Sequence, residues 1–112
     1  MRKLIVVALA AAAVAVLAAT ALAATRSVKV GDNYYVRPSG VPKVTVSKGT
    51  TVAWHFRGSA PHTVSVKRGP VKFSSRPRFS GTYRKKLTRR GTYTIFCKIH
   101  GSRDQSMKLV VK

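Results

Sequence analysis

The chain has 112 residues, and its 22 Lys and Arg face only two acidic residues, Asp32 and Asp104, which gives a formal net charge of +20. Two carboxylates nearly exclude reactions that depend on paired acids, such as glycoside hydrolysis. The charge favours anionic partners and salt-sensitive association, although a solubilising surface in a chain of basic composition explains the same numbers.

Residues 1–23 have the pattern of an export signal peptide. Arg2 and Lys3 precede an apolar run, which ends in Ala21-Leu22-Ala23, the small-x-small sequence of a signal-peptidase site. The run is close to the roughly 20 residues that cross a bilayer, so an uncleaved membrane anchor is the alternative interpretation. In both cases we expect the rest of the chain outside the cytoplasm, either secreted or in the cell envelope or periplasm.

Residues 24–112 have the length of one small domain. This segment carries 20 Lys and Arg against two Asp, a formal charge of +18. Small exported domains often depend on disulfides, but the single cysteine, Cys97, cannot form one within the chain. Cys97 is therefore a free thiol, a link between chains or a metal ligand, and a bound metal is another way to stabilise a small domain.

Short runs rich in β-branched and aromatic residues alternate with Gly, Pro and Ser, which predicts an all-β sandwich or barrel. In chain order, the expected strands lie within 27–40 (two, around a turn at 31–33), 43–56 (two, around a turn at 48–49), 62–67, 81–100 (two, around a turn at 90–91) and 106–112. Residues 68–81 contain too much Pro, Ser and Arg for a strand, so we expect a loop there.

The alternation along these runs also predicts which side chains face the core. The residues expected to point inward are Val44, Val46, Val52, Trp54, Phe56, Val64, Val66, Tyr93, Ile95, Cys97, Met107, Leu109 and Val111. His55 alternates outward, between Trp54 and Phe56. We therefore expect a solvated strand histidine there and not a ligand.

The segment CKIH places His100 three residues after Cys97, and His62 lies in a separate loop, APHTV. A type 1 copper site needs one thiolate, two neutral imidazoles and a weak axial group. A strand that ends in Cys-x-x-His, together with a histidine from another loop, can provide the first three. The sequence thus predicts a copper site of His62, Cys97 and His100, although zinc could use the same ligands.

These segments resemble the cupredoxins, the family of plastocyanin, amicyanin and pseudoazurin. VTVSKGTTVAWHF is similar to the family's strand, Lys-Gly turn and strand with an inward Trp, APHTV to its first ligand loop, and GTYTIFCKIH to its ligand strand and loop. The resemblance covers nearly all of residues 24–112. It implies a Greek-key β-sandwich or barrel that holds one type 1 copper ion, with Thr63 hydrogen-bonded to the cysteine loop.

The axial ligand is the point at which the sequence departs from the family. There, the usual ligand is a methionine two residues before the Gly that opens the last strand. Alignment on MKLVV puts Met107 at the Gly and Gln105 at the methionine, and the plastocyanin-like spacing from His100 also gives Gln105. Met107 is the rival, because a thioether is the commoner axial donor, and a site without a protein axial ligand is the third option. Shorter family loops would point to Arg103, whose guanidinium cannot bind copper.

The resemblance implies electron transfer by a copper ion that cycles between Cu(I) and Cu(II), without enzymatic activity. A nucleophilic Cys97 with His100 as its base has no evident orienting acid or oxyanion device. The alternatives are copper storage or delivery at the cell surface, and a basic module that binds an anionic envelope polymer. We expect a monomer whose partner is an acidic redox protein or an anionic envelope surface, and not nucleic acid.

Overall fold

The computed structural model describes residues 24–112, so the predicted signal or anchor of residues 1–23 lies outside the described residues. The described part contains strands and no helix. The strands are β1 (Thr25–Gly31), β2 (Tyr34–Tyr35), β3 (Lys43–Val46), β4 (Thr51–Phe56), β5 (Ser65–Arg68), β6 (Gly81–Lys86), β7 (Gly91–Phe96) and β8 (Ser106–Val111). Accordingly, no helix in residues 24–112 is long and apolar enough to cross a membrane.

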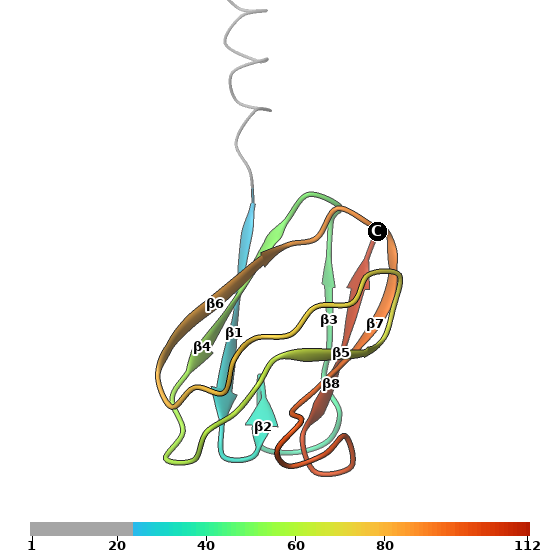
Figure 1. Ribbon diagram of the computed structural model, residues 1–112. Coiled ribbons are helices and arrows are strands. Elements are labelled where there is room, and N and C mark those ends of the chain that lie inside the picture. Colours follow the sequence, from blue (N-terminus) through green and yellow to red (C-terminus); the bar gives the residue numbers. More distant parts are fainter. Residues whose placement is uncertain (1–23) are drawn as a thin grey trace, which may run out of the picture.

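The strands form two four-stranded sheets that pack as a sandwich (Figure 1). The first sheet has the order β2-β1-β4-β6, and the second has the order β3-β8-β7-β5. β1 and β4 are parallel, as are β3 and β8, whereas the other neighbours are antiparallel. The predicted all-β sandwich is confirmed.

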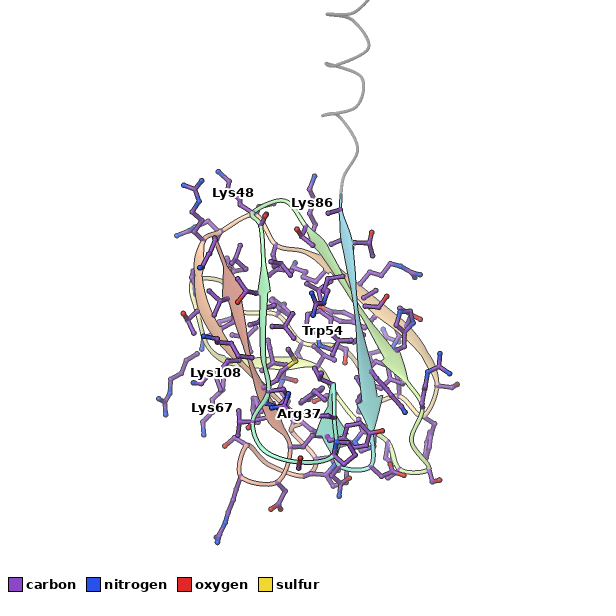
Figure 2. All side chains as sticks on the ribbon, turned by 180° about the vertical axis from the view of Figure 1, so that it is seen from behind. Arg37, Lys48, Trp54, Lys67, Lys86 and Lys108 are labelled. Atoms are coloured by element: carbon purple, nitrogen blue, oxygen red, sulfur yellow. The ribbon has the colours of Figure 1, made fainter. Side chains whose placement is uncertain are left out.

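The inward residues of both sheets form one hydrophobic core, and all of the side chains expected there are buried. Trp54 is fully buried in the interior (Figure 2), and its ring centroid lies 6.2 Å from that of Phe73 and 6.0 Å from that of Tyr83. Residues 69–80 form a loop, as predicted, but their Val71 and Phe73 pack against the core. This loop therefore packs against part of the core.

Three connections meet at one end of the sandwich (Figure 1). They are the turn between β1 and β2, the segment between β4 and β5, and the segment between β7 and β8. The start of β1 and the C-terminus lie at the opposite end. The fold thus brings Asp32, His62 and Cys97 to the same end of the molecule, although they are far apart in the sequence.

The basic side chains are spread over the molecule (Figure 2). Lys48 and Lys86 lie at the end where β1 begins, whereas Arg37 and Lys67 lie nearer the other end. This distribution agrees with the sequence, in which Lys and Arg occur along the whole length of residues 24–112. It favours a general attraction to anions over one localised basic patch.

Candidate metal centre

Cys97 directly follows β7 and continues its inward-facing alternation, so its thiol is fully buried. The loop that follows folds back on itself: the Gly101 N–H donates to the Cys97 carbonyl (2.8 Å), and the Cys97 N–H donates to the Gln105 carbonyl (3.2 Å). Gly101 has a φ of +85°, a left-handed conformation that glycine adopts without a Cβ clash. This loop brings His100 Nδ1 to 3.4 Å from Cys97 Sγ.

His62 reaches the same place from the segment between β4 and β5. Its backbone is held by Arg78, whose carbonyl accepts from the His62 N–H (3.0 Å) and whose N–H donates to the His62 carbonyl (2.9 Å). The His62 ring is fully buried, and its centroid lies 4.9 Å from that of His100. One ligand atom from each of His62, Cys97 and His100 lies within 4.8 Å of the others. The structure therefore brings the three predicted residues together.

Thr63 joins the two ligand segments. Its backbone N–H donates to Cys97 Sγ (3.4 Å), and its Oγ1 accepts from the Lys98 N–H (2.9 Å). The expected hydrogen bond from Thr63 to the cysteine loop is confirmed. Cysteine binds a metal as the thiolate, and this N–H would remain a hydrogen-bond donor to the metal-bound sulfur.

Gln105 is buried, and its side-chain oxygen faces His62. Its Nε2 donates to the carbonyls of Tyr34 (3.1 Å) and Gly31 (3.3 Å). These two bonds orient the amide, so its Oε1 lies 2.8 Å from His62 Nδ1. An oxygen atom that could bind a metal therefore lies beside an imidazole nitrogen of the cluster.

Met107, the rival axial residue, lies within β8 and pairs with Ile95 of β7. Its side chain is fully buried and belongs to the hydrophobic core. A flexible thioether in this position fills space between the sheets. Of the two rivals, Gln105 is the one whose possible ligand atom lies beside a residue of the cluster, since its Oε1 is 2.8 Å from His62 Nδ1.

Asp32 contacts His62, a contact that was not predicted from the sequence. The carboxylate accepts from the Ser59 N–H (2.7 Å), His62 Nε2 (2.7 Å) and the Ala60 N–H (3.1 Å). The bonds from Ser59, His62 and Ala60, in that order, lower the pKa of Asp32 to about 2. Both ring nitrogens of His62 face oxygen acceptors, Asp32 at Nε2 and Gln105 Oε1 at Nδ1. The anionic carboxylate is the stronger acceptor, so it favours the neutral ring form with its hydrogen on Nε2, in which Nδ1 offers a lone pair to a metal and no hydrogen to Gln105. The only signal in the sequence was the scarcity of acidic residues.

Tyr35 supports the segment that carries His62. Its buried hydroxyl donates to the Thr63 carbonyl (2.6 Å), and burial raises the pKa of Tyr35 above its ordinary value, so the phenol remains a neutral donor. Because Tyr35→Phe would leave that buried carbonyl without this donor, we expect urea denaturation to show a free energy of unfolding lower by about 1–3 kcal/mol. Tyr34→Phe, at the half-buried neighbour, is the control. Equal losses in both variants would contradict this role of Tyr35.

His55 lies outside the cluster, on the outer side of β4, and its predicted outward position is confirmed. Its ring is only partly exposed, because Nδ1 lies 3.0 Å from Thr82 Oγ1 and Nε2 lies 3.2 Å from Ser27 Oγ. We expected the His55 ring to be solvated, but hydroxyl groups of the neighbouring strands β6 and β1 take the place of part of the water around it. This histidine is a useful control for variants of the cluster.

The donor atoms of the cluster fit a type 1 copper ion. One cysteine sulfur and two imidazole nitrogens lie together, and an amide oxygen lies beside one of the imidazoles. A His₂Cys set with a weak axial Met, Gln or backbone oxygen is the arrangement of blue copper sites. His62, Cys97 and His100 could therefore hold the metal.

The fold and the cluster also agree with solved structures of cupredoxins, although no protein-family model and no curated protein matches the chain. A methionine-to-glutamine variant of amicyanin with Cu(I) is 26% identical, with 79% of this chain and 82% of that chain covered and a TM-score of 0.65. A methionine-to-alanine variant of amicyanin in its Cu(I) form is 25% identical over 81% of this chain and 85% of that chain, with a TM-score of 0.66.

A purple cupredoxin from Nitrosopumilus maritimus is 17% identical and covers 78% of this chain and 99% of its own, with a TM-score of 0.64. At that identity the similarity supports the fold alone. The resemblance stated from the sequence is confirmed: the chain has the cupredoxin β-sandwich fold, and its His62, Cys97 and His100 form a cluster that could hold a single copper ion.

Proposed function

We propose that the chain is an exported type 1 copper protein that transfers electrons by cycling one copper ion between Cu(I) and Cu(II). The observation that supports this most strongly is the convergence of His62, Cys97 and His100 within 4.8 Å on an amicyanin-like sandwich. We propose no enzymatic role. The full burial of Cys97 suits a metal thiolate better than a nucleophile that must reach a substrate.

In this proposal the metal ligands are His62 Nδ1, Cys97 Sγ and His100 Nδ1, with Gln105 Oε1 as the axial donor. The support for Nδ1 is geometric, since Nδ1 of His62 faces Gln105 and Nδ1 of His100 faces the sulfur. The support for Gln105 is its orientation by two carbonyl acceptors.

A site for electron transfer needs ligands that move little between the two oxidation states. The loops that carry the cluster are cross-linked by the hydrogen bonds of Thr63 to Cys97 and Lys98, and of Tyr35 to Thr63. Cys97 directly follows β7, Gln105 directly precedes β8, and His62 forms an isolated β-bridge with Arg78. We therefore infer that the site is stiff and that its reorganisation energy for electron transfer is small.

We propose His100 as the point at which electrons enter and leave. His62 is fully buried, whereas His100 is only partly buried and its neighbour Ile99 is 48% exposed. His100 is thus the imidazole of the cluster that comes nearest to solvent. Its exposed edge would bring a partner close to the metal.

The proposed partner is an acidic redox protein or an anionic envelope surface, and the proposed state of the chain is a monomer. The formal charge of +18 on residues 24–112 supports an acidic partner, and Lys98 and Arg103 lie exposed in the ligand loop itself. The same spread of charge gives no support to sequence-specific recognition of nucleic acid.

Stopped-flow mixing of the Cu(I) protein with an oxidised acidic electron-transport protein tests this function. We expect fast electron transfer with a rate that falls as salt is added, because screening weakens the attraction. A chain that binds copper but exchanges no electrons in this assay would contradict the proposal and favour copper storage or delivery.

Export is tested separately, by mass spectrometry of the protein recovered outside the cytoplasm. We propose that cleavage after Ala23 leaves Ala24 as the first residue of the mature chain. Intact residues 1–23 in a membrane fraction would instead support the anchor.

Substitution of Met107 tests the rival axial ligand. Met107→Leu conserves the volume of a core side chain, so we expect a loss of stability below about 1.5 kcal/mol. Copper absorption and reduction potential should stay at their wild-type values, because the thioether packs in the core. Leu109→Met, on the same face of β8, is the packing control. A changed copper spectrum in Met107→Leu alone would identify Met107 as a ligand.

A further inference from the structure

We propose that Asp32 is a positioning residue of the metal centre: its carboxylate holds the His62 ring with Nδ1 toward the metal and stabilises Cu(II) relative to Cu(I). This inference rests on the proposed function. Asp32 is one of only two acidic residues in a chain with 22 Lys and Arg. Its place against a ligand histidine is therefore a specific feature of the site and not part of a general pattern of surface ion pairs.

The carboxylate connects two of the segments that meet at this end of the sandwich. Asp32 lies in the turn between β1 and β2, and its oxygens accept from the backbone of Ser59 and Ala60 as well as from His62 Nε2. The two backbone bonds fix the position of the carboxylate. The third bond, at 2.7 Å, transmits that position to the imidazole.

Gly58 shows how closely the backbone packs around this hydrogen bond. A Cβ atom at Gly58 would clash with Asp32 Oδ1 and would lie 2.7 Å from His62 Nε2. Since real Cβ atoms essentially never come so close, a side chain at Gly58 would push the two groups apart. The absence of a side chain at this position is required for the contact between Asp32 and His62.

The chemistry of the contact gives Asp32 two effects on a bound metal. A carboxylate that accepts the Nε2 hydrogen orients the ring and makes Nδ1 a better donor, as such partners do for histidine ligands in general. It also places a negative charge near the metal, which stabilises the more positive Cu(II) more than Cu(I). This local charge opposes the +18 of the surrounding domain.

Asp32→Asn tests the proposal, with Asp104→Asn as the matched control. Both variants remove one negative charge from an exposed side chain, but Asp32 is hydrogen-bonded to His62, whereas Asp104 lies in the ligand loop outside the cluster. We expect Asp32→Asn to bind Cu(II) about 10- to 100-fold more weakly and to have a higher reduction potential than the wild type. Asp104→Asn should show a clearly smaller change in both quantities. Equal changes in the two variants would overturn the proposal.

Gly58→Ala tests the same contact without a change of charge. We expect it to weaken Cu(II) binding and raise the potential in the same direction as Asp32→Asn. Wild-type values in Gly58→Ala, with the variant folded by circular dichroism, would contradict the proposed geometry.

A measurement on the metal-free wild type separates this inference from the proposed function and needs no variant. Proton–nitrogen NMR of the His62 ring should show a hydrogen on Nε2 that exchanges slowly with solvent. A bare Nε2, or a rapidly exchanging hydrogen, would overturn the role of Asp32 whatever metal binds. A wild type with this protected hydrogen that binds no copper would instead contradict the proposed function and remove the basis for a role in a copper site.

Discussion

Cys97→Ser is expected to abolish the intense blue absorption of the copper-loaded protein completely. The absorption requires a thiolate bound to Cu(II), and Cys97 is the only cysteine of the chain. Serine is nearly isosteric with cysteine, and its hydroxyl could still accept the hydrogen bond from the Thr63 backbone N–H. The metal-free variant should therefore keep the fold. The measurement is the visible spectrum after addition of one equivalent of Cu(II), with circular dichroism as the test of folding.

His55→Gln is the control for this prediction, since His55 lies outside the cluster, between hydroxyls of the neighbouring strands. The control should retain the full absorption. A blue band that survives in Cys97→Ser, or disappears in His55→Gln, would show that the ligands have been assigned wrongly.

Gln105→Met is expected to raise the reduction potential by more than about 59 mV, which is a tenfold change in relative affinity for a one-electron couple. The reason is that an amide oxygen is a harder donor than a thioether and favours Cu(II), and the axial ligand tunes the potential. The variant should also lose stability, by about 1–3 kcal/mol, because the buried carbonyl of Gly31 and the partly buried carbonyl of Tyr34 lose their donor. Cyclic voltammetry and denaturation measure the two effects.

Gln105→Leu is the matched control, because it removes the same hydrogen bonds and offers no donor to the metal. The difference in potential between the Met and Leu variants isolates the contribution of the thioether. A potential unchanged from the wild type in both variants would remove Gln105 from the ligands of the metal.

The sheets and the core were predictable from the sequence because their signal is local. The alternation of Val52, Trp54 and Phe56, and of Tyr93, Ile95 and Cys97, reflects the two-residue period of a strand, and each of these side chains is buried. The loop at 69–80 was also predicted from its composition. Its contribution of Val71 and Phe73 to the core was not, because no regular period marks a side chain that packs from a loop.

The cluster of His62, Cys97 and His100 was predicted from residue type and order, because few residue types can bind copper and the chain contains few of them. The contact between Asp32 and His62 was not predicted. It joins residues 30 positions apart through a turn and a loop, and neither segment has a periodicity that fixes its side chains. The fit of Gly58 against this pair is likewise a property of the folded backbone.

Titration of the purified domain, residues 24–112, with Cu(II) tests the central claim most directly. We predict a blue thiolate-to-copper charge-transfer band that grows in proportion to added metal and reaches its maximum at one copper per chain. A colourless protein that binds no stoichiometric copper would contradict the account and favour a basic cupredoxin-fold module that binds an anionic polymer.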